Sequence, residues 1–208
     1  MKATSFIVRT LFNPQYFIVI LVFATMMSVK IEATDHSPNL INSSTPFIYL
    51  KQWQIVTDPS PKSPLPKISA SAWKQVDLSL NEKLYSEGNW LLKTTIFVQD
   101  SLTESDVLGL FPLGFITAFE IYWDGEIIAQ NGVRGSNKEA EKAGLLNFII
   151  VLPSKIITPG RHTLMLRISS YHNYSPLTFL DGDVVVGKYD SVKEAFYKTG
   201  YLAFFISG

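Results

Sequence analysis

The chain has 208 residues, of which 47% are hydrophobic and 17% charged, with no cysteine and a formal net charge of zero. This length predicts one domain with short appendages, and the apolar content is enough to fill its core. The absence of cysteine excludes a disulfide scaffold, a thiolate zinc site and a cysteine nucleophile. The neutral charge argues against nucleic-acid binding, which needs a basic surface to neutralise phosphates.

The N-terminus carries a basic start followed by an apolar run. Lys2 and Arg9 are the only charges before Lys30. Residues 16–29, which lie between Arg9 and Lys30, are apolar apart from one threonine and one serine. At about 1.5 Å per residue this run is short for a hydrocarbon core of about 30 Å, which indicates a secretory signal. Cleavage is expected after Ala33, or else residues 6–12 join the run and form an uncleaved anchor. In both cases the remaining chain is exported.

We therefore expect three segments before the C-terminal tail. Residues 1–33 are a signal peptide or membrane anchor, residues 34–46 are a linker, and residues 47–190 form an extracytoplasmic (periplasmic), membrane-associated domain. A buried N-terminal helix is the alternative for the first segment, but the polar stretch 34–45 that follows at once is typical of a junction between a leader and a domain.

The domain itself shows the pattern of an all-β protein. Short apolar runs alternate with clusters of glycine, proline, asparagine and aspartate. Leu164, Leu166 and Ile168 alternate with polar neighbours, as half-buried antiparallel strands do. Asp124-Gly125 predicts a tight hairpin turn, and four prolines within residues 58–67 predict a surface crossing. Strands are expected at residues 47–56, 73–80, 90–98, 107–111, 118–123, 126–130, 147–152, 162–169 and 184–186.

Two helices are expected in addition to these strands. Residues 138–143 suit a short surface helix, and residues 191–208 begin with a capping Asp190 or Ser191 and become apolar from Gly200 onward. We expect this second segment to be the truncated start of a membrane helix, because tyrosines stand where the charged part meets the apolar part. The alternative is a final helix that packs back on the sandwich.

Few residues suggest catalysis or metal binding. His36, His162 and His172 show no zinc-site spacing and are expected to face solvent. The carboxylates of Asp181 and Asp183 are weak candidates for calcium, because the rest of a calcium loop is missing and an ordinary turn also explains them.

A glycosidase pair is not supported either. Glu120 and Asp124 lie four positions apart on one strand, which places them roughly 13 Å apart, beyond the spacing that either glycosidase mechanism needs. No catalytic residue, resident metal or cofactor is therefore predicted, and the chain is expected not to be an enzyme.

Aromatic residues offer the best candidate for ligand contact. Trp73 and Trp90 are expected in the core, because tryptophan buries a large apolar area. The mixed loop of Tyr171, His172, Asn173 and Tyr174 could instead stack on and hydrogen-bond a sugar, and these four are the candidate ligand-binding residues.

Several short motifs, taken in order, resemble a known family. They are Gly88-Asn89-Trp90, residues 107–110, residues 119–125, residues 128–132, Leu152-Pro153, Pro159-Gly160 and residues 164–168. Together they are similar to the galactose-binding-like jelly roll, as in the sugar-binding domain of family 2 glycoside hydrolases. They are closer to the extracellular domains of bacterial seven-transmembrane receptors with diverse intracellular signalling modules. Lys93, Asp124 and Arg161 depart from the residues usual in that pattern.

The resemblance covers roughly residues 50–189 and implies a jelly-roll β-sandwich that senses a ligand outside the cell. It implies three kinds of partner: a small-molecule or carbohydrate ligand, the membrane, and a cytoplasmic signalling output module on the full-length protein. Two other functions stay open: a carbohydrate-binding or accessory domain of an exported glycoside hydrolase, and a free periplasmic structural protein.

Overall fold

The computed structural model describes residues 39–60, 64–77, 87–99, 106–113, 117–145, 149–172, 183–194 and 196–197. All of them belong to one compact unit, Ser37–Gly208. The expected signal or anchor segment, residues 61–63 of the four-proline crossing and the apolar tail from residue 198 lie outside these residues. The fold described below is therefore that of the β-rich domain alone.

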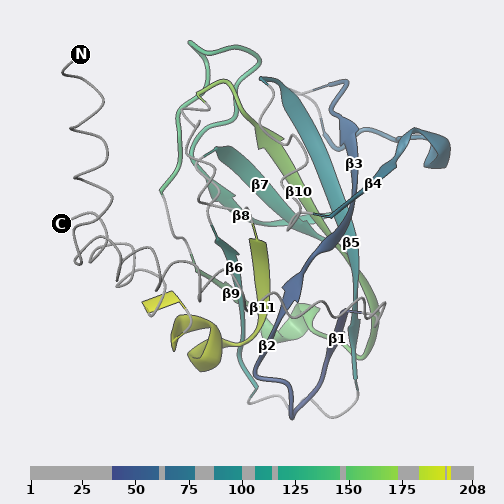
Figure 1. Cartoon of the computed structure of the whole chain (residues 1–208), viewed down its shortest axis with the longest axis vertical. Helices are drawn as coiled ribbons and strands as arrows, with labels where there is room; N and C mark the ends of the chain where they lie inside the picture. The colour runs from purple at the N-terminus through teal and green to yellow at the C-terminus, as the bar shows by residue number, and fades with distance from the viewer. Residues whose placement is uncertain are drawn as a thin grey trace, which may run out of the picture. The chain divides into compact units, whose positions relative to one another are not determined.

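Two sheets make up this domain (Figure 1). The seven-stranded sheet contains β4 (Lys74–Asp77), β3 (Gln52–Thr57), β5 (Asn89–Val98), β10 (Gly160–Ser169), β7 (Ala118–Trp123) and β8 (Glu126–Asn131), in that order, and β1 (Asn39–Ile41) also pairs with β5. The four-stranded sheet has the order β2 (Phe47–Leu50), β11 (Asp183–Lys188), β6 (Leu108–Leu113) and β9 (Ile150–Leu152). Every pairing is antiparallel except that of β1 with β5.

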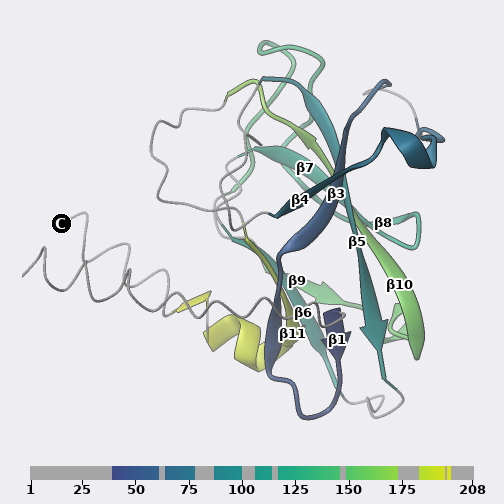
Figure 2. The ribbon, with the colours of Figure 1, turned by 45° about the vertical axis from the view of Figure 1, so that its right-hand side comes forward.

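A single large hydrophobic core joins the two sheets. Leu164, Leu166 and Ile168 of β10 belong to the same buried cluster as Leu108, Leu110 and Val186 of the smaller sheet. Because side chains alternate along a strand, the opposite face of each sheet turns away from this core. The expectation of an all-β sandwich is confirmed, and Figure 2 shows the strands of the two layers from the side.

Strand β5 forms the centre of the larger sheet and has two partners along one of its edges. Its first part, Trp90–Lys93, pairs with β3, and its last part, Ile96–Val98, pairs with β1. Between these two pairings lie Thr94 and Thr95, where β3 has moved away from β5. The side-chain amide of Asn39 donates to Thr94 Oγ1 at 3.0 Å and to the Thr95 carbonyl at 2.9 Å, so this gap keeps its hydrogen bonds.

Four expectations about local structure need correction. The single strand expected at 47–56 is two strands, β2 and β3, which lie in different sheets. The expected linker contains β1. Residues 138–143 form turns and an isolated bridge between Val133 and Lys142 instead of a helix. Trp73 lies outside the main core, whereas Trp90 packs against that core.

A helical segment at residues 189–194 and 196–197 covers part of the outer face of the smaller sheet. Val192 is fully buried there with Phe111 and Val185, and the rings of Phe111 and Phe196 meet edge to face at 5.2 Å between centroids. The described part of the tail therefore packs on the sandwich. In the part of the chain that the structure describes, no helix has the length and apolar character needed to span a membrane.

Candidate functional site

The outer face of the seven-stranded sheet carries the polar features of this domain. Positions 161, 163, 165, 167 and 169 of β10 alternate with its core residues and therefore face outward. Directly paired residues share a face, so the ladder with β5 places Phe97, Thr95, Lys93, Leu91 and Asn89 beside them. Two features occupy this face: a buried ion-pair network around Arg167 and an open groove around Lys93 and Arg161.

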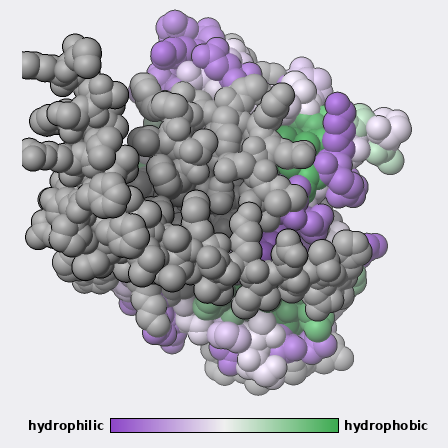
Figure 3. Space-filling view, viewed as in Figure 1, coloured by the Kyte–Doolittle hydropathy of each residue, from purple (hydrophilic) through white to green (hydrophobic). Residues whose placement is uncertain are grey.

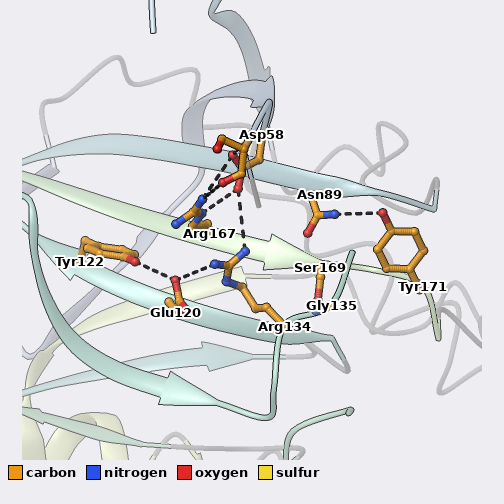
Figure 4. Close-up of polar contacts among 10 residues, drawn as sticks. Asp58, Asn89, Glu120, Tyr122, Arg134, Gly135, Arg167, Ser169 and Tyr171 are labelled. Carbon is orange, nitrogen blue, oxygen red and sulfur yellow. Dashed lines mark hydrogen bonds and ion pairs between the residues drawn. The ribbon is translucent and has the colours of Figure 1, made fainter. Parts of the chain in front are cut away.

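The network joins two arginines to two carboxylates (Figure 4). Arg167 Nε donates to Asp58 Oδ2 at 2.6 Å, and Arg134 Nη2 lies 3.0 Å from Glu120 Oε2 and its Nη1 3.8 Å from Asp58 Oδ2. Tyr122 Oη donates to the same Glu120 oxygen at 2.7 Å. The side chain of Asp58 is fully buried and that of Arg167 is 2% exposed. The network thus ties the segments around Asp58 and Arg134 to the sheet.

The pKa values of this network fit a structural role. Desolvation acts to lower the pKa of Arg167, but the hydrogen bonds and charges of Asp58 and Tyr122 outweigh it and the pKa is raised. Burial, followed by the hydrogen bond to Glu120, raises the pKa of Tyr122. Arg167 is therefore held as a cation and Tyr122 as a neutral phenol at neutral pH. Such a network can hold loops in place.

The groove lies where β3 separates from β5. It has a volume of about 450 Å³ and is lined by side chains and backbone of Gln52, Trp53, Gln54, Gln75, Lys93, Thr94, Thr95, Arg161 and Thr163. Volumes of this order suit a small-molecule ligand. Amide and hydroxyl groups both donate and accept hydrogen bonds, so this lining matches a ligand with many hydroxyls. On the side where Figure 1 places β3 and β4, hydrophilic and hydrophobic surfaces lie next to each other (Figure 3).

The two cations of the groove rest on aromatic rings. The Lys93 ammonium lies 4.1 Å from the centroid of the Trp73 ring, and the Arg161 guanidinium lies 5.5 Å from that of Phe97. Both distances fall within the range of a cation–π contact. Burial lowers the pKa of Lys93 from its ordinary value.

The loop predicted to bind a ligand is only partly described. Tyr171 and His172 are half-buried, and their backbone amides donate to the buried carboxylate of Glu141 at 3.0–3.1 Å. Tyr171 Oη accepts from Asn89 Nδ2 at 2.9 Å, as Figure 4 shows. Asn173 and Tyr174 lie outside the described residues. Tyr171 and His172 are thus near the network end of the outer face and do not line the groove.

The other predicted residues are dispersed. Asp181 lies outside the described residues, and Asp183 begins β11, where its backbone pairs with Leu113. Among the described residues, no group of three or more histidine, cysteine or carboxylate side chains could hold a metal ion.

The expectation that His162 faces solvent is wrong. His162 is 5% exposed rather than solvent-facing, and its ring nitrogens lie 2.6 Å from Asp124 Oδ2 and from the Thr158 carbonyl. The carboxylate of Asp124 also accepts from the Thr163 amide, and that of Glu120 is held by Arg134 and Tyr122. Both carboxylates of the rejected glycosidase pair therefore already have partners within the fold.

Sequence reasoning missed the groove, although one signal for it was present. In the sequence, Lys93 and Arg161 stand out only as departures from a family pattern. The alternation in residues 162–169 already placed Thr163 and Arg167 on a face away from the core. The pattern of residues does not show which strands are neighbours. Gln54 lies beside Lys93 because β3 pairs with β5, and Gln75 lies beside Gln54 because β4 pairs with β3.

No protein-family model and no curated protein matches the chain. Solved structures that resemble the fold include a glycosyl hydrolase family 2 member from Bacteroides cellulosilyticus DSM 14838, at 8% identity and a TM-score of 0.47 over 68% of this chain. A GH2 β-galacturonidase from Eisenbergiella tayi gives 14% and 0.43 over 70%, and a β-glucuronidase from Ruminococcus gnavus gives 14% and 0.46 over 73%. The matches span only 20%, 26% and 30% of those proteins.

Proposed function

We propose that this domain is a non-catalytic carbohydrate-binding module and that the groove on the outer face of its seven-stranded sheet holds the sugar. One observation carries the proposal: the groove of about 450 Å³ is lined by glutamine and threonine residues beside two cations, and Gln54, Gln75, Thr95 and Thr163 lie on the same sheet face as Lys93 and Arg161. A sugar presents hydroxyl groups that donate and accept hydrogen bonds. Glutamine amides and threonine hydroxyls can accept from these groups and donate to them. A galactose-binding-like jelly roll, which the sequence motifs resemble, would be a suitable scaffold.

The groove is also held in shape without a ligand. Thr94 Oγ1 donates to the Gln52 carbonyl at 2.8 Å, and Gln52 Nε2 donates to Asp77 Oδ2 at 2.8 Å. The floor belongs to β5 and β10, which pair over ten consecutive positions. A preformed site loses less conformational entropy on binding than a flexible one does. Binding rather than catalysis is favoured because the carboxylates of Glu120 and Asp124 are already engaged.

The proposal is tested by screening the full chain against an array of neutral and acidic glycans. Bound glycans are then measured with the double variant Gln54→Ala/Gln75→Ala, which removes two amides from the lining. Lys138→Ala, an exposed residue of the turn at 138–140, is the matched control. We expect the double variant to weaken binding by about tenfold or more, at about 1 kcal/mol per lost hydrogen bond. A chain that binds no glycan would refute the function, and binding untouched by the double variant would refute the location.

We further propose that the module is exported and senses its ligand for a membrane-bound signalling protein. The supporting observations are the basic start and apolar run of the N-terminus, the apolar residues 201–207 of the sequence, and the direct passage of β11 into the helix that packs on the smaller sheet. A reporter that is active only outside the cytoplasm, fused after residue 45, tests the export step. An inactive reporter in cells that contain the fusion protein would contradict it.

A further inference from the structure

We infer that the groove takes an acidic ligand, namely a carbohydrate whose carboxylate groups bind Lys93 and Arg161. This inference rests on the proposed function and narrows its ligand to one chemical class. It follows from how the two cations are held.

The positive charge of the groove is not neutralised within the described fold. No carboxylate is present among the lining residues, and no described carboxylate forms an ion pair with Lys93 or Arg161. The contrast with the neighbouring network is direct, because each arginine there has a carboxylate partner. One sheet face therefore carries both a balanced set of charges and an unbalanced pair.

Aromatic rings position these two cations without cancelling their charge. A carboxylate partner would supply a full negative charge, whereas the face of a ring supplies only a quadrupole. Trp73 and Phe97 thus leave Lys93 and Arg161 with most of their attraction for an anion. The lowered pKa of Lys93 agrees with this, since burial disfavours its charged form and a bound anion would favour it again.

The spacing of the cations suits an extended ligand. Arg161 pairs with Phe97, which is four positions from Lys93 along β5, so the two backbone positions are roughly 13 Å apart on one face. Thr95 and Thr163 face each other between them. The two ends of the groove are therefore suited to charged groups and its middle to hydroxyls. An oligosaccharide of uronic acids has this alternation of carboxylates and hydroxyls.

The experiment compares matched ligands by calorimetry on the full chain. Oligosaccharides of galacturonate, glucuronate and mannuronate are each paired with the carboxyl-reduced form, in which every carboxylate has become a primary alcohol. Citrate is the small anion without a sugar. The variants are Lys93→Gln and Arg161→Gln, and the control is Lys74→Gln at an exposed position of β4. Arg161 is exposed, so its variant tests the inference even if Lys93→Gln fails to fold.

We expect at least one acidic oligosaccharide to bind more tightly than its carboxyl-reduced form, and this binding to weaken as the salt concentration rises. Each groove variant should bind that oligosaccharide about tenfold or more weakly than the unchanged protein does, whereas the control variant should bind it equally well. Equal binding of acidic and reduced forms would overturn the acidic ligand and leave the carbohydrate function standing. Binding of citrate alone, lost in both groove variants, would support the anion site and overturn the carbohydrate. Binding of none of these ligands would overturn both.

Discussion

Removing the carboxylate of Asp58 should be among the most destabilising single changes in this domain. Asp58 is fully buried and accepts from Arg167, which is itself 2% exposed, so Asp58→Ala leaves a guanidinium in the protein interior without its main partner. Breaking a buried ion pair from one side costs about 3–5 kcal/mol. A domain of this size is stable by about 5–15 kcal/mol, so the loss would be a large part of the total.

Urea denaturation of the full chain measures this loss through the midpoint and slope of the transition. Asp77→Ala is the matched control, because Asp77 also accepts a side-chain hydrogen bond but lies half-buried on β4, and we expect it to cost about 1 kcal/mol or less. The double variant Asp58→Ala/Arg167→Met should lose less than the sum of its single variants, since no buried charge is then left unpaired. A loss below about 1 kcal/mol for Asp58→Ala would refute the reasoning.

Three further predictions concern a titration, a close contact and a turn. The pKa of Tyr122 is raised above 10.0, so stability should fall as pH rises from that value through its folded pKa; phenolate absorbance should show this late titration and lose it in Tyr122→Phe. A Cβ on Gly109 would lie 3.3 Å from the Tyr189 Cα, so Gly109→Val should displace the helix and speed hydrogen exchange at 189–197 without unfolding the sheets. Gly125 has φ +89°, so Gly125→Val should lose about 1–3 kcal/mol, and an unchanged urea midpoint would contradict this turn.

Much of the fold could be predicted from local patterns, because alternation and turn residues act over short distances. The predicted turn Asp124-Gly125 joins β7 and β8, with both residues at positive φ. The same rule could have placed His162 correctly, since it shares its alternation with the buried Leu164. Residues 138–143 show the opposite case. Their helix-forming composition is overridden because the buried Glu141 binds the backbone of Tyr171, thirty residues away.

The candidate site could not be predicted in the same way, because its parts come from distant segments. Arg167 and Asp58 meet across 109 positions of sequence, and nothing local to either residue indicates the other. Lys93 is held by Trp73 and Arg161 by Phe97, and each contact depends on which strands the sheet places side by side. The composition of the groove was therefore visible in the sequence, but its assembly was not.

The ten-position ladder between β5 and β10 also constrains when this protein can fold. During synthesis, β5 leaves the ribosome long before β10, and β2 long before β11, with which it pairs. The seven-stranded sheet cannot be completed before β10 has been made, and the four-stranded sheet cannot be completed before β11 has been made, since non-local pairings form late and slowly. For the export proposed above, this late closure would leave the nascent chain open while it engages a transport apparatus. Chains that stop before Gly160 lack β10, which joins β5 to β7, and should then be unable to form the seven-stranded sheet.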